Sequence, residues 1–272
     1  GPDTRRPGLG TMAEAFSGFS NVTGEKNGPP TLPNFGLADG IAASYGTFAT
    51  MFALYYRDVQ GGDGQFIDLS IYEPIFQLLG PQPMAYDQLG IIQERMGNRS
   101  LNNAPRNTYQ TLDKHWVAIS TNSPSIVKRV LTLCGGEDVA NDPRFQTPAG
   151  RVEFIDEVDG VVANWISQHN LNDVLEKFEE VEAAVGPVYN IAQIFEDPQY
   201  IARNDIIDLN DEDLGKIKMT AGFPFMSETP PEIRHAGPSK GKHNEEIYCK
   251  ELKLGVEDLS LIHISEPTRP SS

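Results

Sequence analysis

The chain has 272 residues, of which 39% are hydrophobic and 22% charged, and its formal net charge at pH 7 is −16. Such a composition is ordinary for a globular protein of one large or two modest domains. The excess of carboxylates would repel a phosphate backbone, which argues against nucleic acid as the main partner. The sequence has no run of about 18 apolar residues and no signal-like apolar region near its start. We therefore expect a cytoplasmic protein without a membrane partner.

The two cysteines, Cys134 and Cys249, stand far apart and lack CxxC spacing or a cluster of histidines. Neither a disulfide framework nor a zinc site has support in this pattern. We expect structural thiols and no metal ion.

The two ends of the sequence differ from the rest of the chain. The opening, GPDTRRPG, lacks a starting Met, which suggests a fragment. Residues 259–272 begin LSLIHISEPTR, which resembles a translated sequencing adapter more than a protein segment; a natural frayed tail is the alternative. We leave 259–272 out of the fold prediction.

The first third of the chain carries helical and strand patterns in alternation. Apolar residues three and four apart predict helices, and the alternation in QFIDLSI predicts a strand after a Gly-rich turn. The helix that begins near Leu37 is expected to be largely buried because its residues are small and apolar. The expected elements are helices over 12–22, 37–57 and 73–89, a turn over 61–65 and a strand over 65–71.

A polar, irregular segment over 91–107 marks a boundary, and a smaller domain is expected beyond it. TYQTL and HWVAIS predict a hairpin around Asp113 and Lys114. DIIDL and GKIKM predict a second pair of strands. The remaining expected helices cover 126–133, 152–168, 171–182, a segment around DPQY, and 244–253. Strands interleaved with helices predict the α/β class.

Asp39 is a candidate for chemistry because its acidic side chain interrupts a run of small and apolar residues. An unpaired buried carboxylate is costly. From spacing alone, the favoured interpretation is a helix N-cap after the loop at Pro33 and Asn34. The alternative is a nucleophile in a dry pocket at a helix N-terminus, where nearby amides stabilise developing charge and Gly40 leaves room for a thioester.

An ordered series of motifs surrounds Asp39. RPGLGTMAEAFSGFSNVTGEKNGPP and LADGIAASYGTFATMFALYYRDVQGGDGQFIDLSIYEP resemble the central signature of the family III CoA transferases, also called CaiB/BaiF. That family includes formyl-CoA and carnitine CoA transferases and shares its fold with α-methylacyl-CoA racemases. The similarity continues through PRNTYQTLDKHWVAIS, NDPRF, AAVGPVYNIAQIFEDPQY and GKHNEEI, over nearly all of residues 1–258.

The resemblance implies a CoA transferase in which Asp39 is the nucleophile. The carboxylate would attack the donor thioester to give a mixed anhydride, and the CoA thiolate would then form an aspartyl-CoA thioester that the acceptor acid consumes. Coenzyme A and acyl-CoA would be substrates beside a carboxylic acid, with no permanently bound cofactor.

The resemblance also implies an architecture. It consists of an incomplete Rossmann-like large domain and a small α+β domain, in subunits that interlock as a homodimer at full length. Residues 1–94 would be the central part of the large domain, 95–190 the small domain and 191–258 the returning part of the large domain. The missing N-terminal half would carry much of the CoA pocket, so this fragment is expected to be inactive.

Two departures from the family refine the expected activity. Formyl-CoA transferases carry a run of glycines before the hairpin, whereas residues 97–107 contain a single Gly, so a glycine lid is in doubt. The related racemases place a catalytic His thirty residues before the aspartate, where this chain has Leu9. Leucine cannot exchange an α-proton, which favours a transferase over the alternative, a racemase with another base.

Further candidates lie near the strand-to-helix turn and in the linker. Ile71, Tyr72 and Glu73 lie where the family approaches the CoA thiol arm; a helix cap with Glu73 in its first turn is the alternative. Arg106, with Arg95 and Arg99, is a candidate to meet phosphates or the acceptor carboxylate, although solvated linker arginines are the favoured interpretation.

Overall fold

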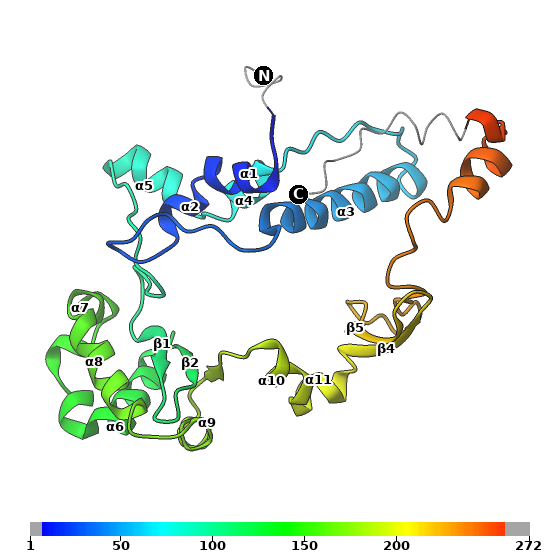
Figure 1. Ribbon diagram of the computed structural model, residues 1–272. Helices are drawn as coiled ribbons and strands as arrows, with labels where there is room; N and C mark the ends of the chain where they lie inside the picture. Colours follow the sequence, from blue (N-terminus) through cyan, green and yellow to red (C-terminus); the bar gives the residue numbers. More distant parts are fainter. Residues whose placement is uncertain (1–6, 259–272) are drawn as a thin grey trace. The chain divides into compact units, whose positions relative to one another are not determined.

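The computed structural model describes residues 7–258, which form two compact units that divide between Val188 and Tyr189 (Figure 1). The predicted tail at 259–272 lies outside the described residues. Each unit is described by itself below. The first contains, in chain order, α1 (Gly10–Phe16), α2 (Phe19–Val22), α3 (Leu37–Asp58), α4 (Tyr72–Gln77), α5 (Gln82–Leu89), β1 (Arg106–Gln110), β2 (Trp116–Ser120), α6 (Pro124–Ala140), η1 (Pro143–Phe145), α7 (Pro148–Glu153), α8 (Ile155–Ile166), α9 (Leu171–Glu180) and β3 (Val185–Pro187).

The helix predicted over 12–22 is divided into α1 and α2. Gly18 adopts φ 92°, a left-handed conformation that interrupts a right-handed helix and that glycine takes without steric cost. The Ser17 hydroxyl donates to the Glu14 carbonyl at 3.0 Å and accepts from the Phe19 amide at 3.3 Å, which stabilises the break. As a result, α1 is a separate short helix whose residues face the start of α3.

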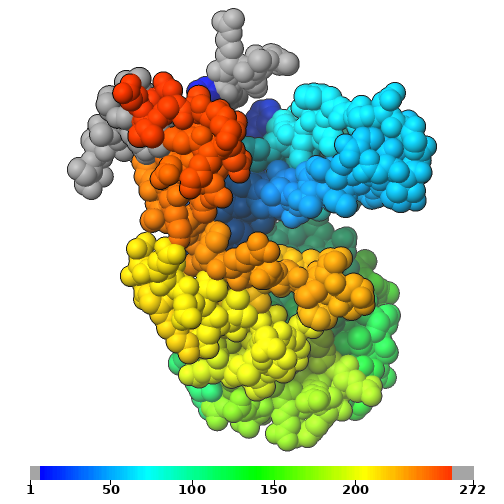
Figure 2. Space-filling view, turned by 90° about the vertical axis from the view of Figure 1, so that its right-hand side faces the viewer, coloured from blue at the N-terminus to red at the C-terminus, as the bar shows by residue number. Residues whose placement is uncertain are grey.

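Helix α3 forms over almost the predicted range, but the expectation that it is largely buried is wrong for the described residues. Ala38 and Ala42 are its buried residues, and Ala38 shares a small buried cluster with Ala13 of α1 and Ile75 of α4. Farther along, its large apolar side chains are exposed. The segment that carries them forms part of the blue-to-cyan surface in Figure 2. These side chains are Phe48, Met51, Phe52, Tyr55 and Tyr56. Among the described residues, the cluster of Ala13, Ala38 and Ile75 at the first turn is therefore what anchors the helix.

The predicted strand over 65–71 is absent, and Phe66 in this segment is 92% exposed. A strand exists only where a neighbour accepts and donates its backbone hydrogen bonds, and none of the described strands pairs with these residues. The helix predicted over 73–89 is also divided, into α4 and α5, at Gly80 and Pro81. Pro81 occupies the N-cap of α5, where its missing amide costs nothing.

The hairpin predicted around Asp113 and Lys114 is confirmed. β1 and β2 pair antiparallel, with Tyr109 opposite Val117, and β3 pairs antiparallel with the other edge of β2. Helices α8 and α9 contribute Val162 and Phe178 to a core with these strands. β3 was not predicted because its three residues, VGP, carry no alternating pattern.

Two helices after the hairpin, α6 and α7, begin directly after residues whose side chains cap them. α6 begins at Pro124 because the Ser123 hydroxyl accepts from the Ile126 amide at 3.3 Å, two residues earlier than predicted. The predicted helix over 152–168 is α7 and α8, which meet at Phe154. The predicted helix over 171–182 is confirmed as α9.

A buried carboxylate ties the linker to α8. Asp159 accepts hydrogen bonds from the Tyr109 hydroxyl at 2.8 Å, the Asn107 side-chain Nδ2 at 2.9 Å and the Arg99 Nε at 2.8 Å. Burial and the adjacent Asp159 raise the pKa of Tyr109. Because three donors converge on one carboxylate, residues on both sides of the cis Ala104–Pro105 bond are fixed to the same helix.

The second unit, which begins at Tyr189, is the smaller of the two. It contains α10 (Ile191–Glu196), α11 (Pro198–Arg203), β4 (Ile206–Asp211), β5 (Gly215–Thr220) and the π-helical turn η2 (Glu245–Glu251). The predicted strand pair is confirmed, with Asp211 opposite Gly215 at the turn. No helix within residues 7–258 has the length and apolar content needed to cross a membrane.

Candidate active site

Asp39 lies in the first turn of α3, two residues after the helix begins at Leu37. The N-cap position belongs to Gly36, so the interpretation of Asp39 as an N-cap is wrong. A carboxylate in a first turn is still favoured by the amide groups at the positive end of the helix. The side chain opens on a cavity of about 500 Å³, a size typical of ligand pockets, lined by residues 8–11, Glu14, 33–36, Asp39 and Ile71.

The Asp39 side chain is exposed, and within residues 7–258 no hydrogen bond or ion pair holds its carboxylate. Its position depends on a close approach to Gly10 of α1. A Cβ atom added at Gly10 would lie 2.8 Å from Asp39 Cγ and 3.1 Å from Oδ1, and would overlap Oδ2. A Cβ at Gly36 would lie 3.1 Å from Oδ2. The carboxylate therefore rests against two residues that have no side chain.

Glu14 is a second carboxylate at this cavity. Its side chain is 1% exposed, and its Oε1 accepts a hydrogen bond from the Ala38 amide at 3.2 Å. No side chain at Gly36 caps α3, so Glu14 supplies from α1 the acceptor that an N-cap residue usually supplies. The amide immediately before the candidate nucleophile is thus fixed by a residue 24 positions earlier.

Most of the first-turn amides that were expected to stabilise developing charge already donate hydrogen bonds to other acceptors. The Leu37 amide donates to the Phe35 carbonyl, the Ala38 amide to Glu14, and the Gly40 amide to the Gly36 carbonyl. Among the residues that the structure describes, the Asp39 amide is the first-turn donor without a hydrogen-bond acceptor.

The cavity brings together three of the predicted site residues, Asp39, Leu9 and Ile71. Leu9 directly precedes α1, where its carbonyl accepts from the amides of the first turn. Gly40 follows Asp39 on the helix but does not line the cavity.

The other predicted residues lie outside the cavity lining. Tyr72 packs edge-on against Phe16, with ring centroids 5.1 Å apart. Glu73 accepts from the Ser70 amide at 3.2 Å, as a residue at a helix start does. Arg106 donates to the carbonyls of Asn98 and Arg99, both at 3.1 Å, and so braces the linker. Their roles toward CoA remain predictions.

Gly10 and Glu14 were not singled out from the sequence. The available signal was their spacing: four residues apart on a short helix, they share one face. From the sequence alone, Glu14 between Ala13 and Ala15 is expected to face solvent. Its burial follows only from the position of α3.

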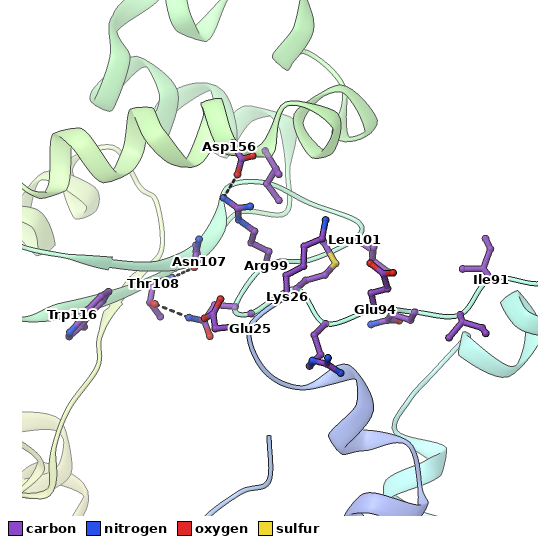
Figure 3. Close-up of a pocket in the computed structure, with 17 residues that line it drawn as sticks. Glu25, Lys26, Ile91, Glu94, Arg99, Leu101, Asn107, Thr108, Trp116 and Asp156 are labelled. Atoms are coloured by element: carbon purple, nitrogen blue, oxygen red, sulfur yellow. Dashed lines mark hydrogen bonds and ion pairs between the residues drawn. The ribbon is translucent and has the colours of Figure 1, made fainter. Parts of the chain in front are cut away.

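A larger cavity of about 1010 Å³ lies elsewhere in the first unit and shares no lining residue with the Asp39 cavity (Figure 3). Arg99 points from its wall to Asp156, at 2.7 Å. Lys26 and Arg95 add two more cationic groups, and Glu25 and Glu94 add two more carboxylates. Since charges of both signs are balanced on its walls, this cavity favours neither an anionic nor a cationic ligand.

Other chemistries have less support in the described residues. No group of three or more His, Cys, Asp or Glu side chains within 7–258 has an arrangement that could hold a metal ion. Burial raises the pKa of Cys134 to about 12, so this thiol is protonated near neutral pH and is a poor nucleophile. Asp39 remains the candidate for covalent chemistry.

Comparison with known proteins first identifies the fold. A CaiB/BaiF family protein from Brucella suis superposes with a TM-score of 0.74 at 25% identity, over 92% of this chain and 64% of that one. The α/β class and the family fold expected from the sequence are therefore confirmed. The model of CoA-transferase family III matches residues 1–244. The chain belongs to CoA-transferase family III.

Curated relatives agree with this assignment. A succinyl-CoA–D-citramalate CoA-transferase of Chloroflexus aurantiacus is 34% identical over 96% of this chain. A succinate–glutarate CoA-transferase of Agrobacterium fabrum is 28% identical over 92% of it. The chain spans 65% and 62% of the lengths of these two relatives.

Proposed function

We propose that this chain carries the nucleophile of a CoA transferase, and that Asp39 attacks the acyl-CoA thioester. The observation that carries the proposal is an exposed carboxylate, without a partner among residues 7–258, at the mouth of a cavity of about 500 Å³. It is also the residue that matches the family's nucleophilic aspartate. A carboxylate with no competing hydrogen bond is free to attack.

In the proposed reaction, an Asp39 oxygen attacks the thioester carbon of the donor, and CoA leaves as a thiolate. The thiolate then attacks the aspartyl carbonyl and expels the donor acid, which leaves an aspartyl-CoA thioester. The acceptor carboxylate then attacks the aspartyl carbonyl of this thioester and expels the CoA thiolate, which leaves a mixed anhydride of Asp39 and the acceptor. The thiolate attacks the acceptor carbonyl of this anhydride, which forms the acceptor's CoA thioester and regenerates the Asp39 carboxylate. Each step converts one activated acyl derivative into another, so the steps are close to isoenergetic.

The proposed substrates are succinyl-CoA and a dicarboxylic acid acceptor. Support comes from the two relatives, whose names give succinyl-CoA with D-citramalate, and succinate with glutarate. The described residues that line the Asp39 cavity include two carboxylates and no cationic side chain. The second carboxylate of such an acceptor is therefore held by groups outside this lining.

A racemase has less support than a transferase. Leu9 lines the cavity where a racemase would need a base, and Glu14 is the other carboxylate on its wall. Glu14 is 1% exposed and already accepts a hydrogen bond from the Ala38 amide, so it is poorly placed to take an α-proton from a substrate.

The proposal also includes a division of the chain into three parts, 1–94, 95–190 and 191–258. It further includes an interlocked homodimer at full length. The exposed apolar side chains of α3 support an assembly that covers them, because contiguous apolar surface of this kind is usual at interfaces.

The test is covalent trapping in the enzyme that carries this chain, at the length of its relatives. With succinyl-CoA and no acceptor, mass spectrometry of a proteolytic digest is expected to find CoA attached to the peptide that contains Asp39, and hydroxylamine is expected to remove it. CoA on a different residue, or turnover without an adduct, would contradict the proposal. Exchange of the substrate α-proton with deuterated solvent, without acceptor, would indicate a racemase instead.

The Gly10→Ala substitution is expected to lower the transfer rate by about 10- to 100-fold, since a displacement of about 1 Å at a reacting group has effects of this size. The new methyl group would occupy the position of Asp39 Oδ2 and force the carboxylate to turn. Steady-state kcat is the measurement. Gly160→Ala in α8 is the matched control, because a Cβ there has no neighbour within 4 Å among the described residues. Equal rates in both variants would show that the carboxylate does not act from this position.

A further inference from the structure

Two residues of α1 meet the start of α3 from one face. Gly10 and Glu14 are four residues apart, so they lie one above the other on the helix. Gly10 receives the Asp39 carboxylate, and Glu14 accepts from the amide of Ala38, the residue before Asp39. One face of α1 thus contacts both the side chain of Asp39 and the backbone directly before it.

The hydrogen bond from Ala38 to Glu14 is shielded from water on both sides. Ala38 is 0% exposed and Glu14 is 1% exposed. A buried amide without an acceptor is costly, so this bond has a strong preference to form. Ala13 and Ile75 pack beside it and limit movement of the turn.

We propose that Glu14 is a positioning residue for Asp39, an inference that rests on the function proposed above. Glu14 fixes the first turn of α3 through the Ala38 amide, and the turn directs the Asp39 carboxylate over Gly10 and into the cavity. Glu14 acts as a hydrogen-bond acceptor and makes no contact with the reacting atoms.

If Glu14 acts as a hydrogen-bond acceptor, two substitutions at this position are expected to have different effects. Glu14→Gln keeps a carbonyl oxygen that can accept from Ala38, whereas Glu14→Met keeps a similar volume but has no strong acceptor. In Glu14→Met the turn loses its hydrogen bond without a large cavity, so the protein is expected to fold. Ser20→Ala is the matched control, because Ser20 is buried on the neighbouring helix α2 and its hydroxyl has no hydrogen-bond partner within residues 7–258.

The test measures catalysis and hydrogen exchange in the same variants of the enzyme that carries this chain. Glu14→Met is expected to lower kcat about tenfold or more, with KM for succinyl-CoA changed less than about threefold, because geometry at the reacting group is lost while binding remains. Glu14→Gln and Ser20→Ala are expected to stay within about threefold of the parent kcat. Amide exchange in the peptide that covers 36–42 is expected to rise in Glu14→Met alone.

Three outcomes would overturn the inference. They are an unchanged kcat in Glu14→Met, an increase in KM without a decrease in kcat, and a Glu14→Gln variant as slow as Glu14→Met. If the parent enzyme forms no CoA adduct on Asp39, the proposed function fails, and the catalytic part of the inference fails with it. The exchange measurement needs no turnover, so it still reports whether Glu14 holds the turn and separates the two failures.

Discussion

Replacing Asp39 by asparagine is expected to lower CoA transfer by roughly 10³-fold or more and to abolish the CoA adduct, since the nucleophile itself is removed. Asparagine has nearly the shape of aspartate and fits against Gly10 and Gly36 in the same way. Its amide cannot form an anhydride or a thioester under these conditions. The expected loss is therefore chemical, with the fold retained, and it is measured as kcat and as adduct on the digested peptide.

A matched control distinguishes this effect from a general effect of the charge change. Asp173 is an exposed aspartate in the first turn of α9, and Asp173→Asn removes the same charge from an equivalent helix position. We expect this variant to retain the parent rate. Turnover in Asp39→Asn comparable to that of Asp173→Asn would refute the assignment of Asp39.

The Asp159→Ala substitution is expected to destabilise the first unit by about 3–5 kcal/mol, the usual cost of removing one partner from a buried charged network. Asp159 is the common acceptor for Tyr109, Asn107 and Arg99, so its loss leaves the buried Tyr109 hydroxyl and the Arg99 Nε without partners. The measurement is the free energy of unfolding from urea titration, followed by Trp165 fluorescence because this residue packs against the same core.

Asp156 provides the comparison, because it pairs with the same arginine at 2.7 Å but its side chain is 88% exposed (Figure 3). Asp156→Ala is expected to cost at most about 1 kcal/mol, since solvent screens an exposed ion pair. Similar losses in the two variants would mean that burial of Asp159 does not determine its contribution.

Local patterns predicted the elements whose stability depends on nearby residues. α3, α9 and both hairpins were predicted within a few residues because their periodicity and turns lie in the segment itself. The strand over 65–71 was wrong because a strand needs a neighbour, and the alternating pattern in QFIDLSI does not say whether one is present. Gly18 and Gly80 divided two helices because a single left-handed residue outweighs a favourable apolar pattern.

The candidate site was predicted in part, for a similar reason. Asp39 was identified from the ordered motifs around it, whereas its spacing alone favoured an N-cap, which the structure assigns to Gly36. Glu14 was missed because its role depends on a contact 24 residues away, between two helices. Local sequence contains no information on which buried amide a glutamate will meet.

The close approach of Asp39 to Gly10 has a consequence for the variation that relatives can tolerate. A side chain at position 10 and a carboxylate at position 39 compete for one volume, so the two positions cannot change independently. A family member with any larger residue at the equivalent of Gly10 must hold its aspartate in a different rotamer or move α1 away from α3. In the proposed reaction, paired substitutions at these two helices would change the angle at which the carboxylate meets the thioester.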